Sequence, residues 1–429
     1  MSDLIVNGGK RVSGRIRVSG NKNAVLPMLC ASLLTDQPVT LENVPDISDV
    51  VKILSYFASQ GSKIERDLAS QTLTIQHDLE RFAATSTELP VGMRAAVLLL
   101  APVIARAGEL QLDTEAKGCA LGVREIDPHL DILEQFGNEI VERHPYRIKR
   151  AGTLYAQSIW ADYASVTATE TFLMMAAMAQ GTSVLTNAAS EPHVQALCDM
   201  LIAMGVQISG IGTSRLQITG SPHLSGATAR VPDDHHEVAT LLALGGVTGG
   251  RVTVETDILA HMPLIFRQFE KLGMQFEVGT NEVTVTGWTR EVTQPYTTEI
   301  LPKIEAAPWP YFPADLLPQA IGVAVGCRQP VMFWNKVYEG ALGWSGELLK
   351  FGARVTMSDP HRLIVFGDNT LRPATVESPY IIRVVVGLLL AAVQIDGQSC
   401  IRNADPIKRA YPNFAEKLAL LGADIEWRN

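Results

Sequence analysis

The chain has 429 residues, of which 47% are hydrophobic and 19% are charged, so a folded protein of two or three domains is expected. Its net charge of -9 argues against nucleic acid as a partner, because a phosphate backbone needs a basic surface. The longest apolar runs, 95–105 and 384–393, are shorter than the roughly 20 residues of a membrane span. The first residues carry no targeting pattern, and a cytoplasmic location is expected.

The cysteines are few, odd in number and far apart, and they form no CxxC pair. A disulfide framework or a zinc cluster is therefore not expected, and the compartment is predicted to be reducing. Four of the five are predicted to be packing residues in apolar surroundings. The five are Cys30, Cys119, Cys198, Cys327 and Cys400.

In chain order, two short strands are predicted within 4–18, followed by Ser19-Gly20-Asn21-Lys22-Asn23 and an apolar helix. Backbone N–H groups at the start of a helix attract anions, and Lys22 would add a positive charge. One interpretation of this segment is therefore an anion site. The other is a capping loop with a solvated lysine.

A pattern of amphipathic helix, glycine and alternating strand recurs six times along the chain. The glycines follow one another at steps of 76, 68, 68, 79 and 70 residues, which indicates repeated structural units. Each glycine stands where a helix ends and the chain reverses, which favours a positive φ. An apolar helix and a short strand precede each pattern, so one repeat should be helix–strand–helix–strand–strand. The repeat glycines are Gly61, Gly137, Gly205, Gly273, Gly352 and Gly422.

The preceding helices are unusually apolar, which predicts that they pack inside with sheets outside. The sixth repeat lacks its last strand, and the strand pair in 4–18 is expected to complete it. The predicted fold is α/β, a two-domain inside-out α/β barrel built from six repeated units. The first domain would span 21–231 and the second would combine 1–20 with 232–429. An open solenoid of six repeats is the alternative.

The segment 116–124 lies between a predicted strand and a predicted helix and contains two glycines, which indicates a mobile loop. Lys117 and Arg124 flank Cys119, and neighbouring positive charges favour the thiolate form of a cysteine. Such a thiol can also act as a general acid. An incidental loop cysteine is the alternative interpretation.

Other charged residues stand out because they break the packing pattern. Several cations that point into one cleft would form an anion site. Asp315 opens a predicted helix and is a candidate carboxylate, with a plain helix N-cap as the alternative. The cations are Arg94 and Arg383 at the starts of apolar helices, Lys336 after a strand, and Lys408 and Arg409 before the last helix.

The acidic and histidine-rich segment Asp233-Asp234-His235-His236-Glu237 suggests a metal site at first. Neighbouring histidines on a helix are expected to point in different directions, so a metal is not predicted there. The chain contains no GxxxxGK[ST] loop, no GxGxxG after a strand and no GxSxG elbow. Kinase-like, dinucleotide-binding and esterase functions therefore lose their main sequence support.

Several motifs together carry a resemblance to a known family. They include SGNKNAVLP at 19–27, NVPDISDV at 43–50, GCALGVREIDPH at 118–129, SEPHV at 190–194, FPAD at 312–315 and LGADIE at 421–426. With these motifs the chain resembles the UDP-N-acetylglucosamine 1-carboxyvinyltransferases nearly end to end. More distantly it resembles 5-enolpyruvylshikimate-3-phosphate synthase.

The resemblance implies transfer of the enolpyruvyl group of phosphoenolpyruvate to the 3-hydroxyl of UDP-N-acetylglucosamine, the step that opens peptidoglycan synthesis. It implies that Cys119 protonates the methylene carbon and is the target of fosfomycin, and that Asp315 is the base. It implies no metal or other cofactor. Lys22 would be catalytic. It would also bind phosphoenolpyruvate, together with Arg94, Arg124, Lys336, Arg383 and Arg409. Asn23, Ser165, Val166, Thr167, Glu191 and Asp315 would bind the acceptor.

Some positions depart from the family's pattern, mostly on the nucleotide side. Glu125 stands where the family usually has a proline, and Asp162-Tyr163-Ala164 stands where it has a lysine before its diphosphate loop. Lys336 replaces an arginine, the stretch after it is longer, and the segment PDDHHE at 232–237 has one extra residue. A lost cation and an added carboxylate weaken diphosphate binding. Another hydroxyl acceptor therefore remains an alternative, as does a catalytically silent ligand-binding paralogue.

Overall fold

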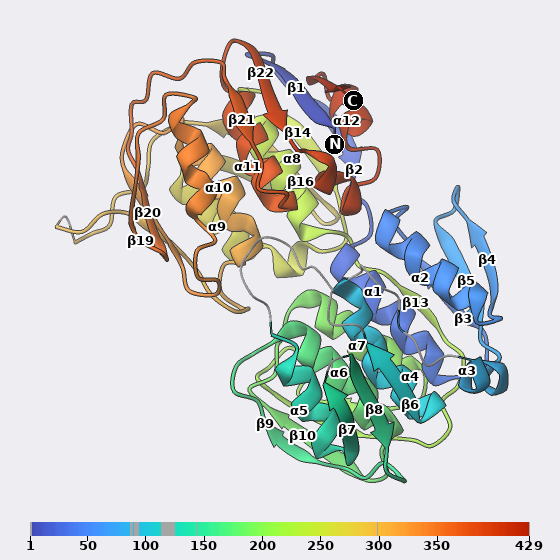
Figure 1. Cartoon of the computed structure of the whole chain (residues 1–429). Coiled ribbons are helices and arrows are strands. Elements are labelled where there is room, and N and C mark those ends of the chain that lie inside the picture. Colours follow the sequence, from blue (N-terminus) through green and yellow to red (C-terminus); the bar gives the residue numbers. More distant parts are fainter. Residues whose placement is uncertain are drawn as a thin grey trace. The chain divides into compact units, whose positions relative to one another are not determined.

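The computed structural model describes residues 2–85, 89, 94–112, 125–143, 145–297 and 299–428. Their internal contacts divide the chain into two compact domains (Figure 1). The first domain holds the described part of 20–232, and the second combines 2–19 with the described part of 233–428. Each domain has its own hydrophobic core.

The first domain contains three sheets among its described residues, with strand orders β13-β3-β5-β4, β6-β8-β7 and β11-β12-β10-β9. The strands are β3 (Val39–Glu42), β4 (Lys63–Asp67), β5 (Thr72–Gln76), β6 (Glu109–Leu112), β7 (Asn138–Arg143), β8 (Tyr146–Arg150), β9 (Ser158–Trp160), β10 (Thr182–Thr186), β11 (Gln207–Ser209), β12 (Arg215–Thr219) and β13 (Thr228–Arg230). The helices are α1 (Lys22–Ala31), α2 (Ser48–Ser59), α3 (Leu79–Thr85), α4 (Leu100–Ala107), α5 (Asp127–Gln135), α6 (Val166–Met178) and α7 (Pro192–Ala203), with 3-10 turns η1 (Ser32–Leu34) and η2 (Arg94–Leu99).

The second domain repeats this plan with sheets β15-β16-β14-β2, β17-β18-β20-β19 and β21-β22-β1-β23. The strands are β1 (Asp3–Gly8), β2 (Gly14–Arg17), β14 (Val252–Glu255), β15 (Met274–Val278), β16 (Glu282–Trp288), β17 (Lys303–Ala306), β18 (Val331–Asn335), β19 (Val355–Asp359), β20 (Arg362–Val365), β21 (Thr375–Glu377), β22 (Gly397–Arg402) and β23 (Asp424–Arg428). The helices are α8 (His235–Val247), α9 (Pro263–Lys271), α10 (Leu317–Ala324), α11 (Ile382–Ala392) and α12 (Phe414–Leu420), with 3-10 turns η3 (Leu259–His261), η4 (Ala314–Leu316), η5 (Gly343–Leu349) and η6 (Asp405–Arg409).

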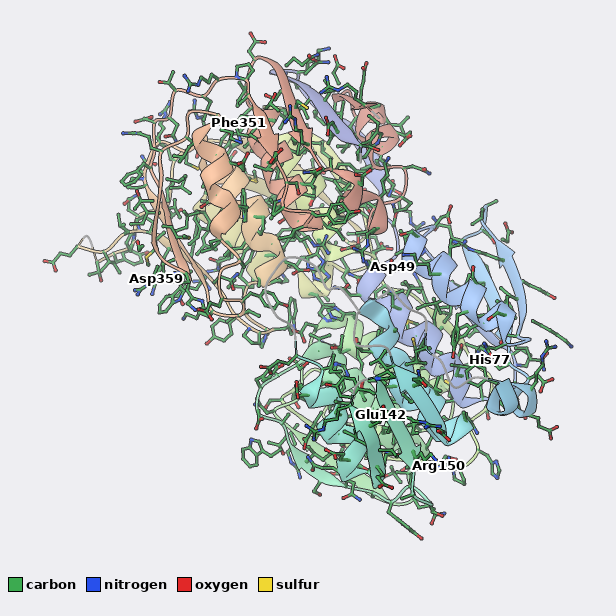
Figure 2. All side chains as sticks on the ribbon, viewed as in Figure 1. Asp49, His77, Glu142, Arg150, Phe351 and Asp359 are labelled. Atoms are coloured by element: carbon green, nitrogen blue, oxygen red, sulfur yellow. The ribbon has the colours of Figure 1, made fainter. Side chains whose placement is uncertain are left out.

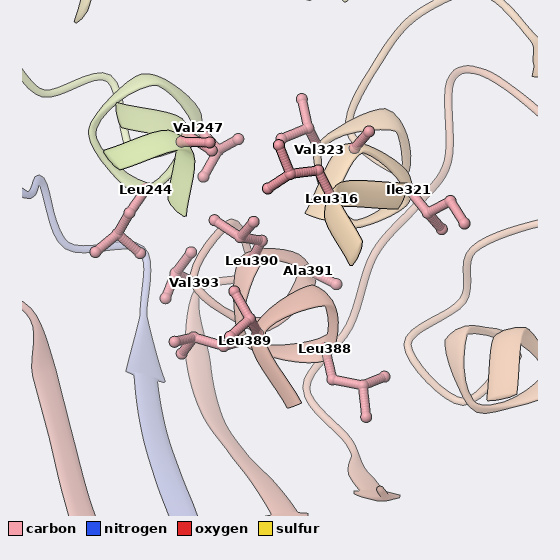
Figure 3. Close-up of a cluster of buried hydrophobic side chains, with 14 of the residues drawn as sticks. Leu244, Val247, Leu316, Ile321, Val323, Leu388, Leu389, Leu390, Ala391 and Val393 are labelled. Carbon is pink, nitrogen blue, oxygen red and sulfur yellow. The ribbon is translucent and has the colours of Figure 1, made fainter. Parts of the chain in front are cut away.

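The apolar helices lie inside each domain, as predicted. All residues of α8 are buried, as are those of α10, and α11 is buried except at Ile382. Figure 3 shows Val247, Leu316 and Leu390 pointing into the space between these helices. Helices α10 and α11 approach closely because Gly322 and Gly387 face each other, and a Cβ on Gly322 would lie 2.4 Å from the carbonyl oxygen of Gly387.

The sheets cover these helices and turn one face outward. In strands β7 and β8, for example, Glu142 and Arg150 are exposed (Figure 2). The predicted two-domain α/β fold of six repeats, with helices inside and sheets outside, is therefore confirmed. None of the helices in the described part of the chain is long and apolar enough to cross a membrane.

The sheets contain more strands than the repeat predicts. In the described residues, five of the six sheets add a parallel strand beside the three predicted ones, for example β13 beside β3 and β9 beside β10. Strands β9, β13 and β21 have three residues each, too few to show a period-two pattern.

The predicted position of the N-terminal strand pair is correct for one strand and wrong for the other. Strand β1 completes the last sheet, where it pairs with β22 and β23. Strand β2 does not join that sheet, because it pairs in parallel with β14 and forms the edge of the fourth repeat's sheet. The two neighbouring strands thus serve different repeats, and no local pattern distinguishes these partners.

The six repeat glycines all have a positive φ, between 84° and 105°, which confirms the predicted helix reversal. Gly273 and Gly422 have almost the same φ, 86° and 91°, but different surroundings. A Cβ on Gly273 would lie 2.7 Å from the carbonyl oxygen of Glu291, whereas the nearest atom at Gly422 is 3.5 Å away.

We expect Gly422→Ala to lower the free energy of unfolding by about 1–2 kcal/mol, through backbone strain alone. Gly273→Ala should cost clearly more, because a backbone carbonyl must also move. Both residues lie in the second domain, so urea unfolding followed with the same probe measures the difference. Equal losses would contradict the role given to Glu291.

Candidate active site

In the first domain, Lys22 begins α1 and is held in an ion pair. Its Nζ lies 2.6 Å from Oδ2 of Asp49, which comes from the first turn of α2. The side chains of Lys22 and Asp49 are 13% and 3% exposed. The lysine is therefore not a solvated surface residue, and Asp49 fixes the position of its charge.

The cap of α1 is made by Asn21. Its Oδ1 accepts hydrogen bonds from the backbone N–H groups of Asn23 and Ala24, at 2.7 and 3.1 Å. The segment before α1 thus caps the helix, as the alternative interpretation of a capping loop predicts. An anion near this helix start would interact with the Lys22 charge rather than with those two N–H groups.

The predicted acceptor residues in this domain lie at the starts of two helices. Ser165 is the N-cap of α6, where its side chain accepts a hydrogen bond from Ala168 N, and Val166 and Thr167 form the first turn. Glu191 is the N-cap of α7, which packs against α6.

Buried His129 of α5 fixes the first turns of α6. Its Nε2 lies 3.0 Å from Oγ1 of Thr167, and its Nδ1 lies 2.8 Å from Oγ1 of Thr171. The two threonine contacts hold the imidazole between α5 and α6. No role for His129 was predicted from the sequence, although it lies in the GCALGVREIDPH motif.

The residues that depart from the family's pattern on this side reach solvent. Glu125 and Asp162 are exposed, and Tyr163 is 51% exposed. The backbone N–H of Ser165 donates to the carbonyl oxygen of Tyr163, so this turn leads directly into α6. The segment before α6 thus presents a carboxylate and an aromatic ring.

In the second domain, Asp315 and Arg383 lie together. Arg383 Nε is 3.3 Å from Asp315 Oδ2, and the Asp315 side chain is 33% exposed. The alternative that Asp315 is a plain N-cap is wrong, because the N-cap residues of η4 and α10 are Pro313 and Leu316. The carboxylate is instead directed to the guanidinium at the start of α11.

Arg383 is almost completely buried and also donates to the hydroxyl of Tyr411, whose ring it overlies. Burial alone would lower the pKa of Arg383, but Tyr411, Asp315 and Asp234 outweigh it and raise that pKa. Burial raises the pKa of Tyr411, so its hydroxyl stays protonated. The site therefore holds a permanent positive charge beside a partly accessible carboxylate.

Asp234 caps α8, where its Oδ1 accepts from the backbone N–H groups of His236 and Glu237. The rings of His235 and His236 lie against each other, with centroids 3.9 Å apart and planes tilted by 35°, so the expectation that they point in different directions is wrong. This orientation of the His236 ring has a local cause, because its Nδ1 lies 3.2 Å from Oδ1 of Asp234.

The side chains of Asp234, His235 and His236 bring potential metal ligands within 4.8 Å of one another. The positive charge of Arg383 acts on the same carboxylate. A divalent cation at this cluster would be repelled by that fixed charge, and Asp234 is already used as a helix cap.

Burial would raise the pKa of Asp234, but the His236 hydrogen bond and the charges of His236, Arg383 and His235 lower it well below its usual value. A lowered pKa in the folded state contributes stability above about pH 4, and this contribution is lost as the pH falls further. Asp234→Asn keeps an equally good helix cap and removes the charge. We expect it to lower the free energy of unfolding by about 2 kcal/mol at pH 7, and by progressively less below pH 4.

Urea unfolding between pH 3 and 7 measures this difference. The control is Asp78→Asn, because Asp78 is exposed and accepts a backbone hydrogen bond from Arg81 in a similar local turn. A loss at Asp234 that does not change with pH would contradict the electrostatic explanation.

The remaining predicted cations have different surroundings. Lys336 Nζ lies 2.9 Å from Oε2 of Glu305 and 4.3 Å from the centre of the Trp334 ring. Arg409 ends η6 and is half-buried, whereas Lys408 is exposed and overlies Trp427. Arg94 begins η2, but its side chain is outside the described part of the chain. Cys119 and Arg124 also lie outside the described residues.

The structure therefore joins Asp315 with Arg383 in one domain and fixes Lys22 in the other. Asp49 and Tyr411 were not predicted as site residues, because their partners Lys22 and Arg383 are distant in the chain. Asp234 was considered only as a metal ligand, not as a helix cap. For Asp234 a signal existed, because an acidic N-cap followed three residues later by Glu237 resembles a capping box.

This architecture of six α/β repeats, with an aspartate–arginine pair in one domain and an ion-paired helix-start lysine in the other, can be compared with known proteins. Residues 6–418 match the family model of EPSP synthase (3-phosphoshikimate 1-carboxyvinyltransferase). The chain is therefore an enolpyruvyl transferase by class. Because two relatives named UDP-N-acetylglucosamine 1-carboxyvinyltransferase are 40% and 36% identical over nearly the whole chain, it belongs to that family.

Two relatives support the narrower family. UDP-N-acetylglucosamine 1-carboxyvinyltransferase from Bradyrhizobium diazoefficiens is 40% identical over 98% of this chain and 97% of its own. The enzyme of that name from Borreliella burgdorferi is 36% identical over 99% of both chains.

Solved structures confirm the fold at lower identity. The enolpyruvyl transferase NikO from Streptomyces tendae has a TM-score of 0.85 at 24% identity, covering 99% of both chains. EPSP synthase from Acinetobacter baumannii has a TM-score of 0.76 at 16% identity, covering 100% of both.

Proposed function

We propose that this enzyme transfers the enolpyruvyl group of phosphoenolpyruvate to the 3-hydroxyl of UDP-N-acetylglucosamine and releases phosphate, the first committed step of peptidoglycan precursor synthesis. The observation that carries the proposal is the 40% identity over nearly the whole chain to an enzyme of that name. The proposed location is the cytoplasm, a compartment in which buried thiols such as Cys30, Cys198, Cys327 and Cys400 stay reduced.

In the proposed reaction, Asp315 accepts the proton of the acceptor hydroxyl while the hydroxyl oxygen bonds to C2 of phosphoenolpyruvate. Cys119 gives a proton to C3, which completes a tetrahedral phospho-ketal. An acid and a base acting at different atoms allow both proton transfers in one step. The proton movements then reverse: the Cys119 thiolate takes back a proton from C3, Asp315 returns its proton to the departing phosphate, and the enolpyruvyl ether remains on the acceptor.

Phosphoenolpyruvate is densely negative, so several cations should converge on it. Arg383 supplies one such charge beside Asp315, and Asp49 holds Lys22 in place for another. Lysine offers a point charge without bidentate geometry, so Lys336 should contribute less than an arginine. The proposed phosphoenolpyruvate set is Lys22, Arg94, Arg124, Lys336, Arg383 and Arg409.

The acceptor is proposed to contact the helix starts of the first domain. Ser165, Val166 and Thr167 form the beginning of α6, where backbone N–H groups favour a negatively charged diphosphate. Asn23 and Glu191 stand at the starts of α1 and α7 and would contact the sugar.

A second candidate is the same transfer to another hydroxyl compound. The observation that favours it is the exposed Asp162–Tyr163 pair before α6, which offers a carboxylate and a ring and no cation for a diphosphate. An acceptor with a less charged or aromatic portion would fit that surface.

The test is phosphate release from phosphoenolpyruvate by the purified protein, with and without UDP-N-acetylglucosamine. Release that depends on this acceptor and is blocked by fosfomycin supports the proposal. Phosphoenolpyruvate binding without acceptor-dependent release overturns the acceptor assignment. Failure to bind phosphoenolpyruvate would favour a silent ligand-binding paralogue.

A further inference from the structure

The buried arginine of the candidate site uses only part of its hydrogen-bonding capacity within the protein. Nε of Arg383 lies 3.3 Å from Oδ2 of Asp315, and Nη1 donates to the hydroxyl of Tyr411. Nη2 forms no hydrogen bond with any residue that the structure describes. A guanidinium is planar and rigid, so contacts on two of its nitrogens determine the direction of the third. Nη2 is therefore held in a fixed direction and remains available to a ligand.

The hydroxyl of Tyr411 can arrange its own proton in only one way. An arginine donates and never accepts, so the Tyr411 oxygen accepts from Arg383 and its O–H must point elsewhere. Thr240 of α8 is hydrogen-bonded to Tyr411. The Thr240 hydroxyl gives its own proton to the carbonyl oxygen of His236, at 2.7 Å. The Thr240 oxygen is therefore the acceptor for the O–H of Tyr411.

These contacts form a chain of hydrogen bonds with a single direction, from Arg383 through Tyr411 and Thr240 to the backbone of α8. The three residues are 8%, 1% and 1% exposed, so solvent does not readily replace a missing member. The ring of Tyr411 is itself held in place, because it stacks on Phe414 with centroids 5.5 Å apart. The direction of the guanidinium is thus fixed before any ligand binds, which is the property that a preorganised anion site requires.

We propose that Tyr411 and Thr240 are positioning residues for phosphoenolpyruvate: their hydroxyl groups hold Arg383 with Nη2 directed at the anion. This inference rests on the proposed function, in which Arg383 binds phosphoenolpyruvate. The two hydroxyls act through Arg383 and do not contact the substrate. Without them, the buried guanidinium turns toward its other partner, the carboxylate of Asp315, and away from the ligand.

Tyr411→Phe tests the first step of the chain, because it keeps the ring and removes the hydroxyl. The Kd for phosphoenolpyruvate, measured by titration calorimetry, should rise about tenfold or more, since a hydrogen bond from a buried charged donor is lost. The KM for phosphoenolpyruvate should rise by a similar factor and kcat should change less, because lost uniform binding raises KM. An unchanged Kd in the folded variant overturns the positioning role.

Thr240→Val tests the second step, because it keeps the shape of the side chain and removes the acceptor for the Tyr411 O–H. The Kd should rise about three- to tenfold, the effect of one neutral hydrogen bond. Thr240→Ser retains the hydroxyl and should retain most of the affinity, whereas equal losses in the two variants overturn the role of the hydroxyl. The control is Thr248→Val at the other end of α8, where Thr248 donates to the carbonyl oxygen of Leu244 at 2.8 Å. It should leave the Kd unchanged.

The double variant Tyr411→Phe/Thr240→Val distinguishes a chain from two separate effects. If Thr240 acts only through Tyr411, the double variant binds phosphoenolpyruvate no more weakly than Tyr411→Phe alone. A further loss as large as that of Thr240→Val alone overturns the chain. Failure of the wild-type protein to bind phosphoenolpyruvate overturns the proposed function and the positioning role with it. Binding without transfer to UDP-N-acetylglucosamine overturns only the proposed acceptor, because the Kd values still decide the role of Tyr411.

Discussion

Asp315→Asn should lower kcat by about 10²–10⁴-fold, the usual contribution of a positioned general base. The amide has the shape of the carboxylate but cannot take the acceptor proton. Because Arg383 Nε lies 3.3 Å from Asp315 Oδ2, the amide oxygen can replace the carboxylate oxygen, and the fold should be kept. Acceptor-dependent phosphate release measures kcat, and the KM for phosphoenolpyruvate shows whether binding has changed.

The matched control is Asp359→Asn. Asp359 is also paired with an arginine in the second domain, at 2.6 Å from Arg362, and its side chain is 29% exposed compared with 33% for Asp315 (Figure 2). Asp359 ends β19, and neither it nor Arg362 belongs to the proposed substrate-binding residues. The control should keep activity within about threefold, since a surface ion pair contributes little. Asp315→Asn activity at the control's level would exclude Asp315 as the base.

The repeat was predictable because its signals are local. Each glycine follows an amphipathic helix and precedes an alternating strand, and the positive φ at Gly61 or Gly205 follows from that position alone. The buried helices were predictable because α8 and α11 are apolar around their whole circumference.

The added edge strands were not predictable, because their signals are weak. Strand β13 has three residues and pairs with β3, which lies far back in the sequence. The residues of β2 have the pattern of a strand, but nothing in the sequence indicates that β14 is its partner. Pairing of distant segments depends on the closed packing of the whole domain.

In the candidate site, too, some features could be predicted from the sequence and others could not. Lys22 and Asp315 were found from motifs, but their partners Asp49 and Arg383 come from other helices. Arg383 was noticed as a cation, whereas its contact with Tyr411 could not be read from the sequence. A motif identifies a candidate residue, whereas the partner of that residue can be read only from the folded structure.

The second large expected effect concerns the segment that leads into the candidate site. Buried Glu237 of α8 accepts a hydrogen bond from the backbone N–H of Ser19 at 2.7 Å. Lys417 Nζ of α12 lies 2.7 Å from the other Glu237 oxygen and 2.6 Å from Ser19 Oγ. These contacts fix Ser19, three residues before Lys22, at the end of the second domain's N-terminal segment.

Lys417→Met should lower the free energy of unfolding by about 3–5 kcal/mol at pH 8, because the Glu237 carboxylate, 1% exposed, loses its countercharge. Burial already raises the pKa of Glu237 against the opposing effect of Lys417. Removing Lys417 raises that pKa further. A raised pKa contributes stability below the unfolded value near 4.3, and this contribution is lost as the pH rises. The variant should therefore be closer to wild type at pH 5 than at pH 8.

Urea unfolding at both pH values measures the effect, with Lys408→Met as the control. Lys408 is an exposed lysine of the same domain that lies 4.0 Å from the centre of the Trp427 ring, so its loss should cost about 1 kcal/mol or less. The double variant Lys417→Met/Glu237→Gln removes the uncompensated charge and should recover part of the loss. If Lys417→Met is no less stable than Lys408→Met, the buried pair does not hold Ser19 in place, and the position of the segment before Lys22 must be fixed by the backbone bond from Asp234 N to Ser19 O.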